Sequence, residues 1–296
     1  MSSNQCAKCS SLTTLTVSEA QRVLSYGAFI APHLMAPNRG SVLAVFSSSV
    51  YLEDESGALL CLLAPGAEPG PLHVLVSWLP YAEHGMPWDV RGHRLSVGGT
   101  VYSLRSAKHW CPQTTPLTGV PVDARVLLEG APDITAAHAY LHAVEHGRSA
   151  DWRGRALPVL RQLMTSLQLG EPLPPLTSVI GLGPGLTPAA DDVLGAMVIV
   201  LHGLQQRAQA AAVAERVRPL LAATHPISAA HLRAACHGLG NAALHDFVNA
   251  VVSGADDWVA TRNRLTALGA QSGWEMVLGA TLALEVAGAL QPSASP

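Results

Sequence analysis

The chain has 296 residues and a mass of 30.9 kDa, enough for one large domain or two modest ones around a real hydrophobic core. Apolar residues make up 49% and charged residues 13%, which excludes a disordered or fibrous protein and favours a surface partly covered by partner subunits. The formal net charge of −3 argues against nucleic acid as a ligand, and no apolar run reaches the ~20 residues that span a bilayer.

The cysteines indicate a reducing environment. There are five, an odd number, and no secretory signal precedes them. We therefore expect no disulfides and a cytoplasmic protein. Cys6 and Cys9 form a single CxxC pair, and without a second pair they indicate a disordered tip rather than a zinc ribbon.

The first half is predicted to be mainly β. A short helix is expected over residues 17–26, followed by short segments punctuated by Gly, Pro and Asp. Gly98 and Gly99 are a two-residue hairpin signal, because both positions of a type I′ turn need positive φ. Six short strands at this spacing predict a small barrel or sandwich-like unit. They are expected at residues 41–46, 50–53, 58–63, 72–78, 93–97 and 100–104.

The second half is predicted to be helical, because its Ala/Leu-rich segments repeat with helical spacing from Asp133, a candidate N-cap. The expected helices are 133–145, 152–168, 188–206, 209–223, 228–237, 241–253, 256–268 and 272–289. The fold class is therefore α+β, with a mainly-β domain over residues 1–130 and an α-helical domain over 131–296. Near residue 130 the spacing of apolar residues changes from that of strands to that of helices, and no flexible linker intervenes. The two parts can therefore pack as one unit.

Two groups of polar residues fall on these helices. His138, His142 and His146 recur every fourth residue and span about 12 Å, too far for one metal ion, so we expect a surface stripe. A second cluster surrounds a helix that starts with proline and contains His225, Ser228, His231, Arg233 and His237. Arg233 is its best candidate for a substrate carboxylate, because a guanidinium pairs with two oxygens at once.

The most informative stretch is a glycine loop that leads into a helix, with glycines at 181, 183 and 185. Glycine permits backbone conformations closed to other residues and lets a ligand approach the amides. Thr187 is a candidate N-cap and Pro188 suits the first helical position. The amides from Gly181 through Leu186 to Thr187, with the helix dipole behind them, therefore predict an anion site. No lysine follows Lys108, which excludes a Walker-type phosphate loop here.

Two carboxylates, Asp191 and Asp192, follow about one turn inside this helix. They stabilise a helix N-terminus but would repel a phosphate unless a cation or a donor-rich ligand lay between. The pattern therefore indicates either a Mg²⁺-bridged phosphate or a ligand with an anionic end and an amide or amine end. No other cofactor is indicated.

The string GLGPGLTPAADDVLG over residues 181–195 closely resembles the signature of the AllH-like family of bacterial proteins. The β-rich first half and the Gly-Ser-rich segment 269–273 extend the resemblance along the chain. The resemblance implies a role in allantoin catabolism, a branch of purine degradation, as one subunit of a multi-subunit oxamate carbamoyltransferase. That enzyme would exchange a carbamoyl group between oxalurate and phosphate, giving oxamate and carbamoyl phosphate. Only the loop from Gly181 to Asp192 is carried over, as a binding element.

This resemblance and the residues agree on one point. Carbamoyl phosphate has a phosphate end for backbone amides and an NH₂ end for a carboxylate, so Asp191 and Asp192 are the candidate catalytic residues. The same two groups could hold Mg²⁺. Catalysis would rest on positioning and electrostatic stabilisation. The alternative is a non-catalytic scaffold or a small-anion-sensing subunit.

The last helix begins with Ser272-Gly-Trp-Glu275, the pattern of a capping box. Ser272 and Gly273 would join the anion site if this helix start faces the Gly181 loop, because two helix dipoles would then converge on one anion.

Overall fold

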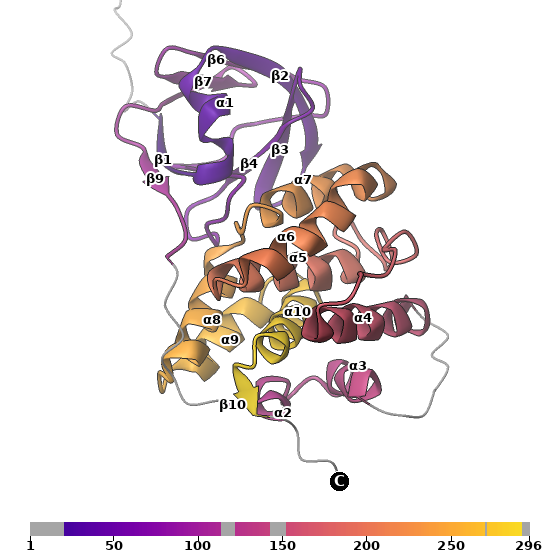
Figure 1. The fold of residues 1–296 in the computed structure, drawn as a ribbon. Helices are drawn as coiled ribbons and strands as arrows, with labels where there is room; N and C mark the ends of the chain where they lie inside the picture. The colour runs from indigo at the N-terminus through magenta and orange to yellow at the C-terminus, as the bar shows by residue number, and fades with distance from the viewer. Residues whose placement is uncertain (1–20, 114–121, 143–151, 270, 292–296) are drawn as a thin grey trace, which may run out of the picture.

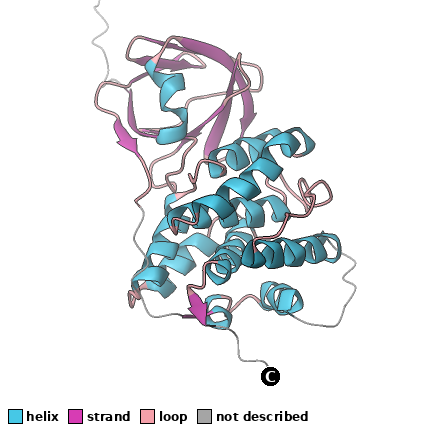
Figure 2. Cartoon of the chain, in the orientation of Figure 1, coloured by secondary structure: helices cyan, strands magenta, loops and turns pink. Residues whose placement is uncertain are grey.

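The computed structural model describes residues 21–113, 122–142, 152–269 and 271–291. A β-barrel forms the first part of the chain, and helices stacked against one end of it form the rest (Figure 1). Figure 2 shows the same division by secondary structure. The predicted α+β class, with strands first and helices second, is confirmed.

Eight strands form the closed barrel, in the order β5-β4-β3-β2-β6-β7-β8-β1, and a β1–β5 pairing closes it. The strand β9 pairs in parallel with β1. Inward-facing side chains such as Leu52, Leu60, Trp88 and Tyr102 fill the interior. The bounds are β1 Gln21–Gly27, β2 Asn38–Val45, β3 Ser49–Asp54, β4 Leu59–Leu63, β5 His73–Val76, β6 Pro87–Arg91, β7 Arg94–Val97, β8 Thr100–Ser103 and β9 Lys108–Trp110.

All six predicted strands are present, and the hairpin between β7 and β8 is confirmed. Val97 pairs with Thr100, and Gly98 and Gly99 have φ values of 54° and 82°. The helix predicted over 17–26 is wrong in its described part, because residues 21–26 belong to β1. This segment is a strand because β5, β8 and β9, all distant in sequence, supply its hydrogen-bonding partners. A 3₁₀ helix η1 (Ala28–Ile30) and a short helix α1 (Ala31–Met35) follow it.

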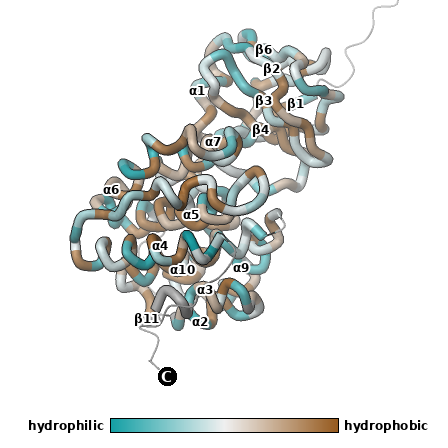
Figure 3. Tube along the Cα trace, turned by 90° about the vertical axis from the view of Figure 1, so that its right-hand side faces the viewer, coloured by the Kyte–Doolittle hydropathy of each residue, from teal (hydrophilic) through white to brown (hydrophobic). Residues whose placement is uncertain are grey.

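The helical part is built around α5 and α10, which lie side by side at its centre (Figure 3). Both helices are apolar on nearly every face, as expected of helices enclosed by others. Each predicted helix is present, although Asp133 lies in the first turn of α3 and not at its cap. The bounds are α2 Ala124–Leu127, α3 Pro132–His142, α4 Trp152–Leu169, α5 Ala189–Gly203, α6 Arg207–Val217, 3₁₀ helix η2 Arg218–Ala223, α7 Pro226–Ala235, α8 Ala242–Ser253, α9 Trp258–Thr266 and α10 Ser272–Val286.

The two parts are packed together. Ile227, Ala230 and Ala234 of α7 belong to the same buried cluster as the barrel interior. At the other end, β10 (Val122–Asp123) pairs with β11 (Leu290–Gln291), and α2 already lies in the helical core. The domain division at residue 130 stays a prediction.

Among the described helices, none is long and apolar enough to cross a membrane. The described cysteines Cys61, Cys111 and Cys236 are free thiols, whereas Cys6 and Cys9 lie outside the described residues.

The prediction that His138 belongs to a surface stripe of histidines is wrong. His138 is buried, and its Nε2 lies 2.8 Å from Oε1 of Glu285 on α10. The side chain of His142 and all of His146 lie outside the described residues.

Candidate functional site

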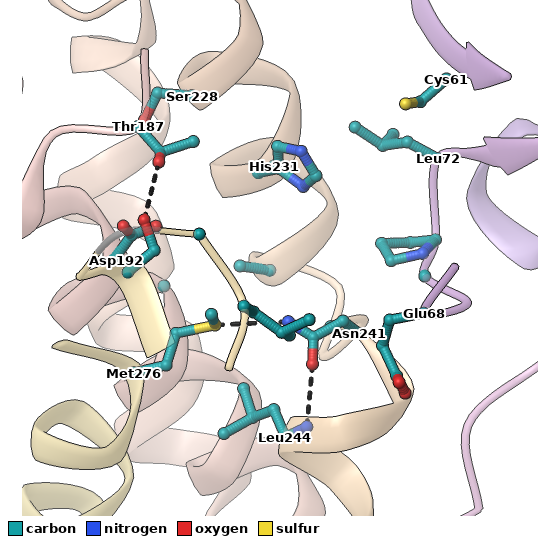
Figure 4. Close-up of a pocket in the computed structure, with 18 of the residues that line it drawn as sticks. Cys61, Glu68, Leu72, Thr187, Asp192, Ser228, His231, Asn241, Leu244 and Met276 are labelled. Atoms are coloured by element: carbon teal, nitrogen blue, oxygen red, sulfur yellow. Dashed lines mark hydrogen bonds between the residues drawn. The ribbon is translucent and has the colours of Figure 1, made fainter. Parts of the chain in front are cut away.

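A cavity of about 480 Å³ lies between the barrel and the helices. In Figure 4, Cys61 and Leu72 of the barrel face Thr187 and Asp192 across it, and His231 of α7 lies between them. Both walls carry polar groups, and those of the barrel wall are Ser49, Tyr51, Glu68 and His73. The polar residues that line the helical wall are Thr187, Asp191, Asp192, Ser228, His231, Asn241 and Ser272.

The loop between β4 and β5 connects the two walls. Glu68 lines the cavity, and its Oε1 accepts a hydrogen bond of 3.3 Å from Arg264 on α9, which also donates to Asp246 on α8. The amide of Ala242 donates to the carbonyl of Pro69 at 2.8 Å. These contacts hold the barrel loop against the helices, and they are contributions of tertiary structure that sequence patterns did not indicate.

Asp191 holds the helical wall together. It is 2% exposed, and its Oδ1 accepts the amide of Gly181 at 2.8 Å. Its Oδ2 accepts the hydroxyls of Thr224 at 2.5 Å and Ser228 at 2.6 Å. Both carboxylate oxygens are therefore used to join the glycine loop, α5 and the start of α7.

The starts of α5 and α10 meet, as the anion-site prediction for Ser272 requires, but both predicted caps are wrong. The N-cap of α5 is Pro188 and that of α10 is Gln271, and neither makes a side-chain capping bond. Instead the hydroxyls of Thr187 and Ser272 lie 3.1 Å apart and bond to each other between the two helix starts. Each hydroxyl therefore joins two helices and caps neither.

Asp192 lies beside this hydroxyl pair. Its Oδ2 is buried and has no hydrogen-bond partner among the described residues. Burial is the main cause that raises the pKa of Asp192 to about 8, and the nearby carboxyl groups of Glu275 and Asp191 contribute to the rise. Hydrogen bonding from Ser272 and Thr187 opposes the shift but does not cancel it. The helix dipole would favour a charged carboxylate here, but burial outweighs it, so Asp192 is protonated at neutral pH.

The nearby Glu275 is also buried, and its Oε2 is unpartnered among the described residues. Burial raises the pKa of Glu275 as well, although Arg153 opposes the shift. The capping box predicted for Ser272 and Glu275 is therefore replaced by a cluster of buried carboxyl groups under the two helix starts.

The cluster around α7 divides between the cavity and the surface. The ring of His225 accepts the amide of Ile227 and caps α7. His231 lines the cavity, and burial lowers its pKa to about 4, so its ring is neutral. Arg233, the predicted carboxylate partner, is exposed and does not line the cavity. The spacing of Ser228 and His231, three residues apart on one helical face, could have identified His231.

The glycine loop adopts the predicted backbone, with positive φ at Gly181, Gly183 and Gly185. A Cβ on Gly181 would lie 2.7 Å from the carbonyl oxygen of Ala223, and one on Gly183 would lie 2.7 Å from the amide nitrogen of Ala189. These two glycines are therefore required by packing within the protein. Gly185 and Leu186 are exposed, and a Cβ on Gly185 would meet nothing.

The loop faces a second hollow, distinct from the cavity. This groove of about 500 Å³ is lined by Gly183 and Pro184 of the loop and by Arg153 and Arg155 of α4. Gly273, another predicted anion contact, is buried instead against the backbone of Leu265. The groove and the cavity are thus lined by different predicted residues.

No metal centre is apparent in the described part of the chain, which contains no group of three or more His, Cys, Asp or Glu residues able to hold an ion. Magnesium at Asp191 and Asp192 stays a prediction.

Comparison with known proteins supports the resemblance seen in the loop. The model of a family described as "oxamate carbamoyltransferase subunit AllH" matches residues 179–284. The match begins just before the glycine loop and ends within α10, so the extension of the resemblance to the barrel stays a prediction. Neither the curated proteins nor the solved structures contain a match to this chain. The family is named as a subunit of a carbamoyltransferase, which implies further protein subunits in a complex.

Proposed function

We propose that this chain is the substrate-binding subunit of an oxamate carbamoyltransferase and that the cavity holds the carbamoyl group during transfer. One observation carries the proposal: every polar residue of the helical wall, from Thr187 to Ser272, lies within the segment that matches the family. The family match therefore covers the whole polar part of the helical wall.

The reaction would break the bond between the carbamoyl carbon and the adjoining nitrogen of oxalurate. A phosphate oxygen forms a bond to that carbon, which gives carbamoyl phosphate. The proton of hydrogen phosphate is transferred to the released nitrogen, which becomes the amide nitrogen of oxamate. Such a transfer requires close positioning of two small substrates and stabilisation of charge. A cavity of about 480 Å³ has the size of a small-molecule site.

The anion site predicted at the glycine loop would be a second site in the outer groove, because the groove shares no lining residue with the cavity, and the phosphate that reacts would bind in the cavity beside the carbamoyl group. The support for this second site is the positive φ of Gly183 together with Arg153 and Arg155 of α4, although Asp133 also lines the groove. A bound phosphate there would be close to the start of α5, the helix that also carries Asp192.

The test is to narrow the cavity from its barrel side. Ala67 is half-buried in the β4–β5 loop and lines the cavity, whereas Ala211 is exposed on α6 and does not. In the complex with its partner subunits, Ala67→Trp should lower carbamoyl phosphate formation from oxalurate and phosphate at least tenfold. Ala211→Trp is the matched control and should leave the rate unchanged.

Two outcomes would contradict the proposal. Full activity of a well-folded Ala67→Trp complex would remove the cavity from the reaction. An unchanged rate for partner subunits that lack this chain would leave it as a scaffold or an anion-sensing subunit.

A further inference from the structure

Asp192 differs from every other carboxyl group that lines the cavity. Asp191 accepts three hydrogen bonds from Gly181, Thr224 and Ser228, and Glu68 is paired with Arg264. Asp192 has a buried Oδ2 with no partner in the described residues, although it lines a cavity large enough for a ligand. Buried polar atoms are nearly always hydrogen-bonded, so the carboxyl group of Asp192 is the one at the cavity wall with capacity left for a water or a ligand group.

The surroundings of Asp192 favour its neutral form. Asp191 lies on the same helix and Glu275 on α10, whereas Glu68 lies across the cavity on the barrel loop, and the ring of His231 on α7 is uncharged. The described residues that line the cavity include no Lys or Arg. Burial and the nearby carboxyl groups therefore keep the pKa of Asp192 near 8, and the group carries a proton at pH 7.

A protonated carboxyl group has a specific hydrogen-bonding pattern. It presents an O–H donor and a C=O acceptor side by side, whereas an ionised carboxylate only accepts. A primary amide presents the complementary pair, an N–H donor beside a C=O acceptor. We propose that Asp192, as a neutral carboxyl group, binds the H₂N–C(=O)– end of the substrate through two paired hydrogen bonds.

This inference rests on the proposed function and specifies it. Oxalurate and carbamoyl phosphate carry the same terminal H₂N–C(=O)– group, the one that is transferred, so Asp192 can hold it on either side of the reaction. The amide of oxamate is a different group, on the leaving side of the bond that breaks, but it presents the same donor beside an acceptor, so oxamate can serve as a stable probe of this site.

Titration calorimetry on the full-length chain with oxamate tests the proposal. A group with a pKa of about 8 falls from roughly 90% to roughly 10% protonated between pH 7 and pH 9. Oxamate binding should therefore weaken about tenfold over this range. Oxalate, which has a carboxylate in place of the amide, should bind at least tenfold more weakly than oxamate at pH 7.

Two variants distinguish binding by a neutral carboxyl group from binding by an ionised carboxylate. Asp192→Asn also presents a donor beside an acceptor, so it should keep oxamate affinity within about threefold at pH 7 and lose the pH dependence. Asp192→Ala should bind oxamate at least tenfold more weakly than the wild type at pH 7 and show no change in affinity between pH 7 and pH 9. Thermal unfolding of each variant establishes that it is folded.

The outcomes distinguish this inference from the proposed function. An Asn variant that binds as poorly as the Ala variant, or wild-type affinity that rises with pH, would overturn the inference alone. If the chain by itself does not bind oxamate, the same titrations are made on the complex with its partner subunits. Absence of oxamate and carbamoyl phosphate binding by that complex would overturn both proposals.

Discussion

The turn between β3 and β4 and the start of α5 each bury an aspartate, with opposite results. In the turn, Asp54 accepts hydrogen bonds from both the amide and the hydroxyl of Ser56, from the amide of Ala58, and from Asn38 and His33. Burial alone would raise the pKa of Asp54, but these donors hold it at about 2. At the start of α5, burial outweighs the hydrogen bonding from Ser272 and Thr187, and the pKa of Asp192 is raised to about 8. A buried carboxyl group with many donors is structural, and one that lacks them is available to a ligand.

Asp191 accepts hydrogen bonds with both of its oxygens, and its removal should have the largest effect on stability. Asp191→Ala deprives the Gly181 amide and the Thr224 and Ser228 hydroxyls of their acceptor. Buried donors without partners cost about 1 to 3 kcal/mol each, so we expect a loss of about 3–5 kcal/mol in the free energy of unfolding. Urea denaturation measures it, and a loss below about 1 kcal/mol would show that Asp191 does not hold the loop.

Asp54 should stabilise the barrel in a pH-dependent manner. The folded-state pKa of about 2 lies below the unfolded value of about 3.9, so the contribution is present above about pH 4 and is lost as the pH falls towards 2. Asp54→Asn should lower the free energy of unfolding by about 2 kcal/mol at pH 7 and flatten its dependence on pH between 4 and 2.

The control for this prediction is Glu55→Gln in the same turn. Glu55 is exposed and pairs with Arg39 on the surface, so its loss should change stability by less than about 1 kcal/mol. If urea denaturation shows equal losses of stability for Asp54→Asn and Glu55→Gln, the prediction that the buried Asp54 stabilises the turn more than the exposed Glu55 is wrong.

Asp192 should show the opposite pH dependence. The folded state keeps this proton up to about pH 8, whereas the unfolded chain releases it near 3.9, so stability falls as the pH rises between these values. Asp192→Asn has no proton to lose. It should match the wild type near pH 4 and exceed it by about 1 kcal/mol or more at pH 8. A variant less stable than wild type at pH 8 would contradict the raised pKa.

Sequence patterns predicted the elements that depend on local periodicity. The apolar spacing of α5 and the turn residues Gly98 and Gly99 are signals contained within a few residues. The strand β1 has no such signal, because its identity depends on the distant strands β5, β8 and β9 that close the barrel. In β1, hydrogen bonding to these distant strands outweighs the local preference for a helix.

The candidate site was predicted in its helical part only. Asp191 and Asp192 were identified as a pair, but their different roles depend on Thr224, Ser228 and Glu275, which lie on other elements. The capping rules failed at Thr187 and Ser272 because each hydroxyl found a partner 85 residues away. The barrel wall could not be predicted, since no local pattern indicates which strands would face a helix start.

The same two regions supply a matched pair of glycines. Gly57 in the β3–β4 turn and Gly185 in the glycine loop have φ values of 80° and 90°, and a Cβ on either would meet nothing. Alanine at either position should therefore cost about 1–2 kcal/mol through backbone strain alone. Gly183→Val is a poorer test, because its Cβ would clash with Ala189 whether or not a ligand binds.

If an anion binds at the amides around Gly185, Gly185→Ala should weaken that binding and Gly57→Ala should not, because a methyl group at residue 185 would then stand beside the ligand. Thermal shift measures it, since a ligand at 100 times its dissociation constant stabilises by about 2.7 kcal/mol. Phosphate, carbamoyl phosphate and oxamate are the anions to compare, each with and without Mg²⁺. Gly57→Ala should keep the full shift of the wild type and Gly185→Ala should lose most of it. Equal shifts in the two variants would place the anion elsewhere, and the exposed glycine of the loop would then serve only to turn the chain into α5.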